Sequence, residues 1–211
     1  MRKHWKTGPA IVFDFGGVLI DWNPYYLYRH FLGEDPEATE RFLQAVDFAG
    51  WNQENDRGRT LAQGTAELAA RFPEYRELIL AYDRRYLESI GGAIQPVVEI
   101  LRRLMEQGYP LYGLSNWPRE KFAIVREIYP FFAWFDKVVI SGEVKLIKPD
   151  RAIFELLLER VGRPAQECVY IDDHLENIAA ARDLDFQTIH FRSPEQLAEE
   201  LHGMGVDLTG K

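Results

Sequence analysis

The distribution of apolar and polar positions divides the chain into two patterns. A continuous apolar run, Ala10 to Phe13, ends at the carboxylate Asp14 and is soon followed by two glycines. Such a run is typical of a buried strand whose tip leaves the core. Between residues 25 and 89, apolar side chains instead recur at helical spacing, and no run predicts a strand. We therefore expect one strand followed by a long helical insertion.

The second pattern begins at Gly91-Gly92, after which helical segments alternate with short strand-like runs. Strands separated by helices imply a parallel sheet with helices on both faces, so the predicted fold class is α/β. The sequence predicts a core of residues 1–21 and 90–211 and an inserted helical domain of residues 22–89. The expected strands are residues 111–115, 137–141, 168–171 and 187–191, and the expected helices are residues 96–107, 120–128, 150–161 and 175–182.

Local signals subdivide the insertion. Residues 21–24 predict a turn, Gly64 within residues 60–65 predicts a helix break, and Phe72-Pro73 marks a helix boundary. The polar residues 51–59 fit two interpretations, a solvated helix end or a loop that faces a substrate. Ahead of the first strand, residues 1–9 are expected to form a short exposed lead-in.

Composition narrows the possible partners. The 211 residues are 46% hydrophobic, enough for a sizeable core, and the net charge of −8 argues against a protein that binds the nucleic-acid backbone. The single cysteine, Cys168, lies inside a predicted strand and is interpreted as a packing residue. No apolar run is long enough to predict a membrane helix or a signal peptide. We expect a cytoplasmic protein that binds neither nucleic acid nor membrane.

Polar side chains of complementary kinds stand at or just beyond the ends of four predicted strands, namely Asp14, Ser115-Asn116, Lys148 and Asp172-Asp173. The carboxyl ends of parallel strands meet at one edge of the sheet, so these groups should converge. Three carboxylates at close range oppose mutual ionisation without a cation, and hard oxygen ligands suit Mg²⁺. The lysine and the serine and asparagine donors would supply the charge and hydrogen bonds that a phosphate group needs.

These four segments resemble, in order, the four motifs of the haloacid dehalogenase superfamily, and the insertion looks like its small helical cap. The resemblance implies a Rossmann-like core and a branch similar to small-cap phosphatases that act on sugar phosphates. It makes Asp14 the nucleophile and a metal ligand, with the Gly16 carbonyl and the Asp173 carboxylate as further ligands. Asp172 would support the metal, and Asn177 would orient the loop of the fourth motif.

The same resemblance implies that Ser115 and Asn116 hold the phosphoryl oxygens and that Lys148 neutralises charge between nucleophile and phosphate. One position departs from the family pattern. Family phosphatases usually carry a second Asp, the general acid and base, where this chain has Gly16. General acid–base catalysis typically contributes about 10²- to 10⁴-fold, so most of the catalytic power can survive this loss. Activity should then favour good leaving groups, unless a cap residue supplies the proton.

The sequence thus favours a Mg²⁺-dependent phosphatase that hydrolyses a small phosphorylated metabolite, with a sugar phosphate as one candidate, through an aspartyl-phosphate. One alternative is a 2-haloacid dehalogenase, in which Asp14 displaces halide without a metal; the acid pair Asp172-Asp173 argues against it. The other is a non-catalytic module that binds a phosphorylated ligand, which Gly16 makes conceivable. The pattern specifies neither the substrate nor the oligomeric state. Candidate specificity residues are Trp22, Trp51, Arg57, Arg59 and Trp117.

Overall fold

A computed structural model describes residues 8–209, so most of the predicted lead-in lies outside the described residues. A five-stranded parallel sheet forms the core, in the order β5-β4-β1-β6-β7. Its strands are β1 (Ala10–Phe13), β4 (Leu111–Ser115), β5 (Lys137–Ile140), β6 (Cys168–Asp172) and β7 (Gln187–His190). The α/β class expected from the alternating pattern is confirmed.

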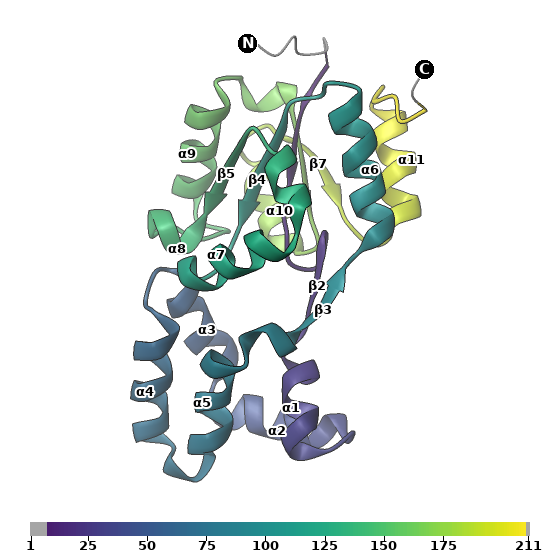
Figure 1. The fold of residues 1–211 in the computed structure, drawn as a ribbon. Coiled ribbons are helices and arrows are strands. Elements are labelled where there is room, and N and C mark those ends of the chain that lie inside the picture. The colour runs from purple at the N-terminus through teal and green to yellow at the C-terminus, as the bar shows by residue number, and fades with distance from the viewer. Residues whose placement is uncertain (1–7, 210–211) are drawn as a thin grey trace.

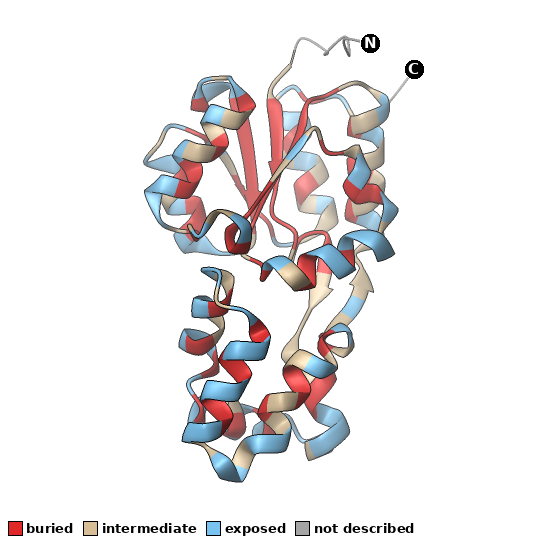
Figure 2. Ribbon diagram, turned by 60° about the vertical axis from the view of Figure 1, so that its left-hand side comes forward, coloured by how far each residue is buried: buried red, intermediate tan, exposed pale blue. Residues whose placement is uncertain are grey.

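Helices cover both faces of this sheet because successive side chains of each strand point to opposite sides. In β1, Ile11 and Phe13 belong to one hydrophobic cluster, and Ala10 and Val12 belong to the other. The first cluster includes α6 (Gln95–Glu106), α7 (Arg119–Ile128) and α11 (Pro194–Gly203), and the second includes α9 (Arg151–Val161) and α10 (Leu175–Arg182). Figure 2 shows the buried strands between helices whose outer surfaces are exposed.

The insertion forms a separate helical layer below the sheet in Figure 1. We call its five α-helices the cap: α1 (Pro24–Leu32), α2 (Pro36–Ala45), α3 (Phe48–Asp56), α4 (Leu61–Arg71) and α5 (Arg76–Arg84). The chain enters the cap through β2 (Ile20–Trp22) and leaves it through β3 (Ile90–Ala93), and these two strands pair antiparallel. The division of the chain into a core and a cap domain at residues 22 and 89 stays a prediction.

Short elements complete the fold. The 3₁₀ turns are Pro73–Tyr75, Tyr86–Ser89, Pro130–Trp134 and Ala165–Glu167, and α8 is a single turn, Ser141–Val144. In the part of the chain that the structure describes, no helix has the length and apolar character needed to cross a membrane.

Three local expectations were wrong or incomplete. The turn predicted at residues 21–24 is instead the end of β2 and the start of α1, where Asn23 Oδ1 accepts from Tyr25 N–H at 2.9 Å. Gly64 does not break a helix but lies inside α4, where a Cβ would come 2.4 Å from Asn55 Oδ1. The sequence analysis also missed α11, although Ser193 and Gln196 form a capping box at its start.

Aromatic packing fixes the segment that follows β1. The Phe15 ring lies 5.7 Å from Phe122, 4.9 Å from Phe132 and 5.3 Å from Phe135, measured between ring centroids. A Cβ on Gly113 would stand 2.2 Å from this ring. Gly113 therefore provides the space that lets the chain after β1 pack against β4.

We expect Gly113→Ala to destabilise the fold by about 1–3 kcal/mol, because the added methyl group forces the Phe15 ring out of a packed cluster. Urea denaturation measures the free energy of unfolding. The control is Gly203→Ala at the end of α11, where an added Cβ meets nothing within 4 Å. Equal stability of the two variants would contradict this account of Gly113.

Candidate active site

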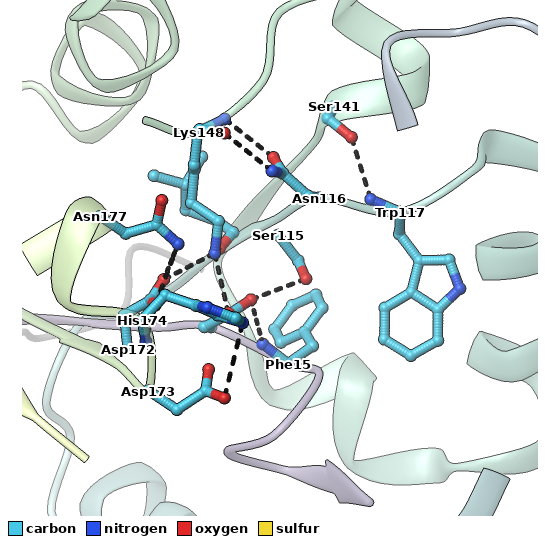
Figure 3. Close-up of polar contacts among 12 residues, drawn as sticks. Phe15, Ser115, Asn116, Trp117, Ser141, Lys148, Asp172, Asp173, His174 and Asn177 are labelled. Atoms are coloured by element: carbon cyan, nitrogen blue, oxygen red, sulfur yellow. Dashed lines mark hydrogen bonds and ion pairs between the residues drawn. The ribbon is translucent and has the colours of Figure 1, made fainter. Parts of the chain in front are cut away.

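The four strand ends singled out in the sequence meet at the carboxyl edge of the sheet (Figure 3). There they line a cavity of about 390 Å³ between core and cap. The core lines it with Asp14, Ser115, Asn116, Lys148 and Asp173, among others. The cap side contributes Asn52, Asp56, Tyr82 and Tyr86. Residues more than 150 positions apart in the chain thus share one cavity.

Lys148 is the centre of the polar network. Its side chain is 1% exposed, and its Nζ lies 2.8 Å from Asp14 Oδ2, 2.7 Å from Asp172 Oδ2 and 3.1 Å from the Leu114 carbonyl oxygen. Burial by itself lowers the pKa of this ammonium group, but the charges of Asp14 and Asp172 and their hydrogen bonds raise it above the ordinary value. Lys148 therefore remains protonated and uses all three N–H donors inside the protein.

Asp14 is held from three sides. Its Oδ1 accepts from Phe15 N–H and from Ser115 Oγ, both at 2.7 Å, while its Oδ2 faces Lys148. Burial raises the pKa of Asp14 to about 7, with Lys148 lowering it and the charges of Asp172 and Asp173 raising it. An additional cation beside Asp14 would favour its ionised form.

Asp172 has its oxygen atoms occupied by protein donors. Asn177 Nδ2 donates at 3.0 and 3.1 Å to its two oxygens, His174 N–H donates at 2.8 Å, and Tyr170 Oη donates to Oδ2. Burial would raise the pKa of Asp172, but the charge of Lys148 and these hydrogen bonds lower it below the ordinary value. Asp172 is therefore a fixed negative charge that positions Lys148.

Asp173 differs from its neighbour because one of its oxygens is unused. Its Oδ1 is buried and has no hydrogen-bond partner, and burial raises the pKa of this carboxyl. Asp14, Asp172 and Asp173 each present one oxygen within 4.8 Å of the others. An unpartnered buried oxygen among three carboxylates is the donor set that a hard cation such as Mg²⁺ prefers. These residues fit the predicted metal.

Gly17 makes room for Asp173. Its φ is +74°, a backbone conformation that favours glycine, and a Cβ there would stand 2.3 Å from Asp173 Oδ2. At Gly16, by contrast, a Cβ would meet nothing within 4 Å. The two adjacent glycines therefore have different roles. Gly17 leaves room for the nearby Asp173 carboxylate, whereas Gly16 borders the open part of the cavity.

Asn116 does not offer a free carboxamide to a ligand. Its Nδ2 donates to the Lys148 carbonyl oxygen at 3.0 Å, and its Oδ1 accepts from Lys148 N–H at 2.9 Å. The side chain thus fixes the backbone that carries the central lysine. The phosphate contacts expected of Ser115 and Asn116 stay predictions. Because the Asn116 carboxamide is already bonded to the Lys148 backbone, any contact of Asn116 with a phosphate would be made by its own backbone.

The structure separates the five candidate specificity residues. Trp22 and Trp117 line the cavity. Trp51 is buried within the cap, where Nε1 donates to the Gly64 carbonyl oxygen at 3.0 Å. Arg59 donates to the Trp51 carbonyl oxygen at 2.8 Å, and Arg57 pairs with Asp150 at 3.1 Å. These last three side chains therefore hold the cap together or tie it to the core.

Sequence analysis placed Asn52 and Asp56 in the polar segment 51–59, for which it offered a loop that faces a substrate, but it did not single them out, and it missed the role of Tyr82 and Tyr86 at the cavity. Asn52 and Asp56 are four positions apart on α3, and Tyr82 and Tyr86 are four apart across the end of α5. Residues at this spacing share one helix face, which is the signal that would have paired them. The polar segment 51–59 is thus neither a loop nor simply a solvated helix end, since its helical part turns one face to the cavity.

Comparisons with known proteins agree with this architecture. A family model described as haloacid dehalogenase-like hydrolase matches residues 9–185. A sesquiterpene phosphatase of Aspergillus oryzae is 27% identical over 188 residues, which cover 87% of this chain and 90% of that protein. A drimenol cyclase of Aspergillus calidoustus is 25% identical over 198 residues, but the match spans only 35% of its length and 91% of this chain.

Among solved structures, a haloacid dehalogenase family enzyme of Bacteroides thetaiotaomicron has a TM-score of 0.72 at 21% identity. The match covers 93% of this chain and 99% of that chain. The same enzyme in complex with magnesium and inorganic phosphate matches with a TM-score of 0.65 at 20% identity, covering 88% and 94% of the two chains. These structural likenesses show a common fold.

Mg²⁺ should stabilise the folded protein, because it would relieve repulsion among three carboxylates. A ligand at about 100 times its dissociation constant adds about 2.7 kcal/mol, which raises Tm by about 5 °C or more at this chain length. Thermal unfolding with and without MgCl₂ measures the shift. Asp173→Asn should lose most of it, whereas Asp183→Asn, the same charge change at an exposed residue after α10, should keep it. A full shift in Asp173→Asn would contradict the assignment.

Gly17→Ala should also weaken the Mg²⁺-dependent shift in Tm, because the added methyl group displaces the Asp173 carboxylate. Gly33→Ala is the matched control, since Gly33 has a similarly positive φ of +82° but an added Cβ there meets nothing within 4 Å. Both variants carry the backbone strain, and only Gly17→Ala should lose Mg²⁺ binding in isothermal titration calorimetry. Equal losses would assign the effect to strain alone.

Proposed function

The chain belongs to the haloacid dehalogenase-like hydrolases, and on that premise we propose that it is a Mg²⁺-dependent phosphatase acting on a small phosphorylated metabolite. The observation that carries the proposal is the unpartnered buried oxygen of Asp173, which completes a set of three carboxylates, two of which contact the protonated Lys148. This combination of carboxylates and a buried ammonium group beside a cavity supports a site that takes both a cation and an anion.

The proposed reaction uses Asp14 as the nucleophile. Its carboxylate attacks phosphorus in line, the bond from phosphorus to the leaving oxygen breaks, and an aspartyl-phosphate forms. Phe15 N–H and Ser115 Oγ orient the carboxylate, while Lys148 favours its ionised form and offsets the charge of the arriving phosphoryl group. Water then attacks phosphorus, and the bond to Asp14 breaks to release inorganic phosphate.

The metal ligands would be Asp14, Asp173 and the Gly16 carbonyl, with Asp172 in support through its contact with Lys148. Mg²⁺ bound there supplies positive charge that lets a phosphate dianion approach the carboxylates. Asp172 keeps its negative charge because the charge of Lys148 and the hydrogen bonds from Tyr170 and His174 lower its pKa below the ordinary value.

Two features of the cavity bear on the substrate. Its volume of about 390 Å³ suits a small ester, and its walls combine aromatic rings with polar groups. Trp22 and Trp117 contribute aromatic rings to the lining, and Asn52 on the cap contributes a carboxamide that Asp56 and Tyr82 hold in place. A sugar phosphate fits this combination, because a sugar ring presents an apolar face to an aromatic ring and hydroxyl groups to polar side chains. The sesquiterpene phosphatase among the relatives supports a phosphate ester more generally.

The acid set argues against the dehalogenase alternative. Displacing halide from carbon requires one carboxylate and no cation, so it gives no reason to bury the unpartnered Asp173 oxygen. The orientation of Asp14 by two donors favours a reacting group over a passive ligand-binding residue.

Asp14→Asn should reduce kcat by at least about 10³-fold in a protein that still folds, because the amide keeps the shape of the side chain but is a poor nucleophile. Release of p-nitrophenol from p-nitrophenyl phosphate measures activity, with MgCl₂ or with EDTA. EDTA should abolish activity, and Asp183→Asn should match the wild type. Three results would overturn the proposal: full activity of the wild type in EDTA, an Asp14→Asn variant that keeps a tenth of the wild-type activity, or release of chloride from 2-chloropropionate.

A further inference from the structure

On the core side of the cavity, Gly16 provides no side chain to protonate the leaving oxygen. Gly16 stands where the resemblance places an acid, and it borders the cavity at a point where an added Cβ would meet nothing within 4 Å. The leaving group of a phosphate bound at Asp14 must point away from the sheet, because in-line attack puts the nucleophile and the leaving oxygen on opposite sides of phosphorus. A proton donor must therefore come from the cap.

Asp56, the last residue of α3, is placed for this task. It lines the same cavity as Asp14 and Lys148, on the cap side, and it feels the charges of both. Asn52, one turn earlier, donates from Nδ2 to Asp56 Oδ2 at 3.2 Å, and Tyr82 Oη donates to Asn52 Oδ1 at 3.3 Å. These two hydrogen bonds fix one oxygen of the Asp56 carboxyl group on the cap side of the cavity.

Contacts between cap and core fix the end of α3 over the cavity. Arg57 pairs with Asp150 at 3.1 Å, and Leu61 N–H at the start of α4 donates to Glu120 Oε1 at 2.7 Å. On the other side of the cap, Lys121 of the core pairs with Asp83 at 2.6 Å. Because Asp56 is the last residue of a helix and adjoins the first of these ties, its carboxyl group is held at the wall of the cavity that also contains Asp14.

Other groups around the cavity are less suited to deliver the proton. Burial raises the pKa of Tyr82 and of Tyr86 well above the ordinary value, so their protons are too tightly held. Lys148 uses its donors on core acceptors. His174 has a side chain 72% exposed and lies 3.7 Å from Asp173, on the core side. Burial raises the pKa of Asp56 to about 8, although Lys148 lowers it, so this carboxyl carries its proton at neutral pH.

We propose that Asp56 is the general acid and base of the phosphatase reaction proposed above, in place of the missing acid at Gly16. As Asp14 bonds to phosphorus, the bond to the leaving oxygen breaks and the Asp56 proton moves to that oxygen, which departs as an alcohol. The Asp56 carboxylate then takes a proton from the attacking water as the bond between phosphorus and Asp14 breaks. The products are alcohol and inorganic phosphate, and both aspartates return to their starting forms.

The test is a series of phenyl phosphates with substituents that change the basicity of the leaving phenolate, followed in single-turnover experiments at saturating Mg²⁺. The wild type should show a shallow dependence on leaving-group basicity, because the departing oxygen receives a proton. Asp56→Asn should slow phenyl phosphate by about 10²-fold or more and p-nitrophenyl phosphate by less than about 10-fold. Glu54→Gln, the same replacement of a carboxyl by a carboxamide at an exposed residue of the same helix, is the control and should match the wild type.

The pH profile gives a second measurement. Asp56 acts first in its protonated form, so the rate on phenyl phosphate should fall as pH rises through about 8 in the wild type. The groups that face Asp56 are Asp14 and Lys148 from the core and Tyr82 and Tyr86 from the cap. None of these is altered in Asp56→Asn, which should lose the alkaline limb.

Three results would overturn the role of Asp56: an unchanged leaving-group dependence in Asp56→Asn, an equal loss on every ester, or a steeper dependence in His174→Gln instead. An equal loss would show that Asp56 only shapes the cavity. A wild type that releases no phosphate from any of these esters with Mg²⁺ would instead overturn the proposed function, together with the inference that rests on it. The ratio of the rates on phenyl phosphate and p-nitrophenyl phosphate therefore distinguishes a failure of the role of Asp56 from a failure of the proposed function.

Discussion

The buried ammonium group of Lys148 is the interaction on which the site depends. It lies between Asp14 and Asp172 and contacts the Leu114 carbonyl, so it joins β1, β4 and β6 at their carboxyl ends. Removing one partner of a buried ion pair typically costs about 3–5 kcal/mol, because the other charge stays buried without compensation. The strand order β4-β1-β6 places the acceptors of this ammonium group next to one another. The two hydrogen bonds between the Asn116 side chain and the Lys148 backbone fix the position of the lysine.

The core and the residues that meet at its carboxyl edge were largely readable from the sequence because their signals are local. Each strand is a short apolar run, and Asp14, Ser115 and Asp172 stand where such runs end, at positions that parallel pairing aligns. The β2 and β3 strands escaped detection because they are three and four residues long and β3 contains two glycines. Gly64 was misread for a different reason, since its role is to admit Asn55 from another helix.

The cap face of the cavity could not be predicted in the same way. Helical spacing groups Asn52 with Asp56, but it does not say which face of α3 turns to the core. That orientation is set by distant contacts, such as Arg57 with Asp150 and Asp83 with Lys121, which no local pattern encodes. The role of Asn116 could not be predicted for a similar reason. A polar residue at the end of a strand can stabilise the protein backbone instead of binding a ligand, and Asn116 does so at Lys148.

The antiparallel pairing of β2 with β3 has a consequence for how such a protein changes over evolution. The inserted segment enters and leaves the core on adjacent strands, so its two ends lie side by side and the sheet is continuous without it. A segment joined in this way can be replaced by another segment as one cassette, because the replacement leaves the five-stranded sheet unchanged. If the proton donor resides on the cassette and the nucleophile on the sheet, then each exchange replaces both the wall that recognises the substrate and half of the proton chemistry. Selectivity and leaving-group preference would then be inherited together as one unit.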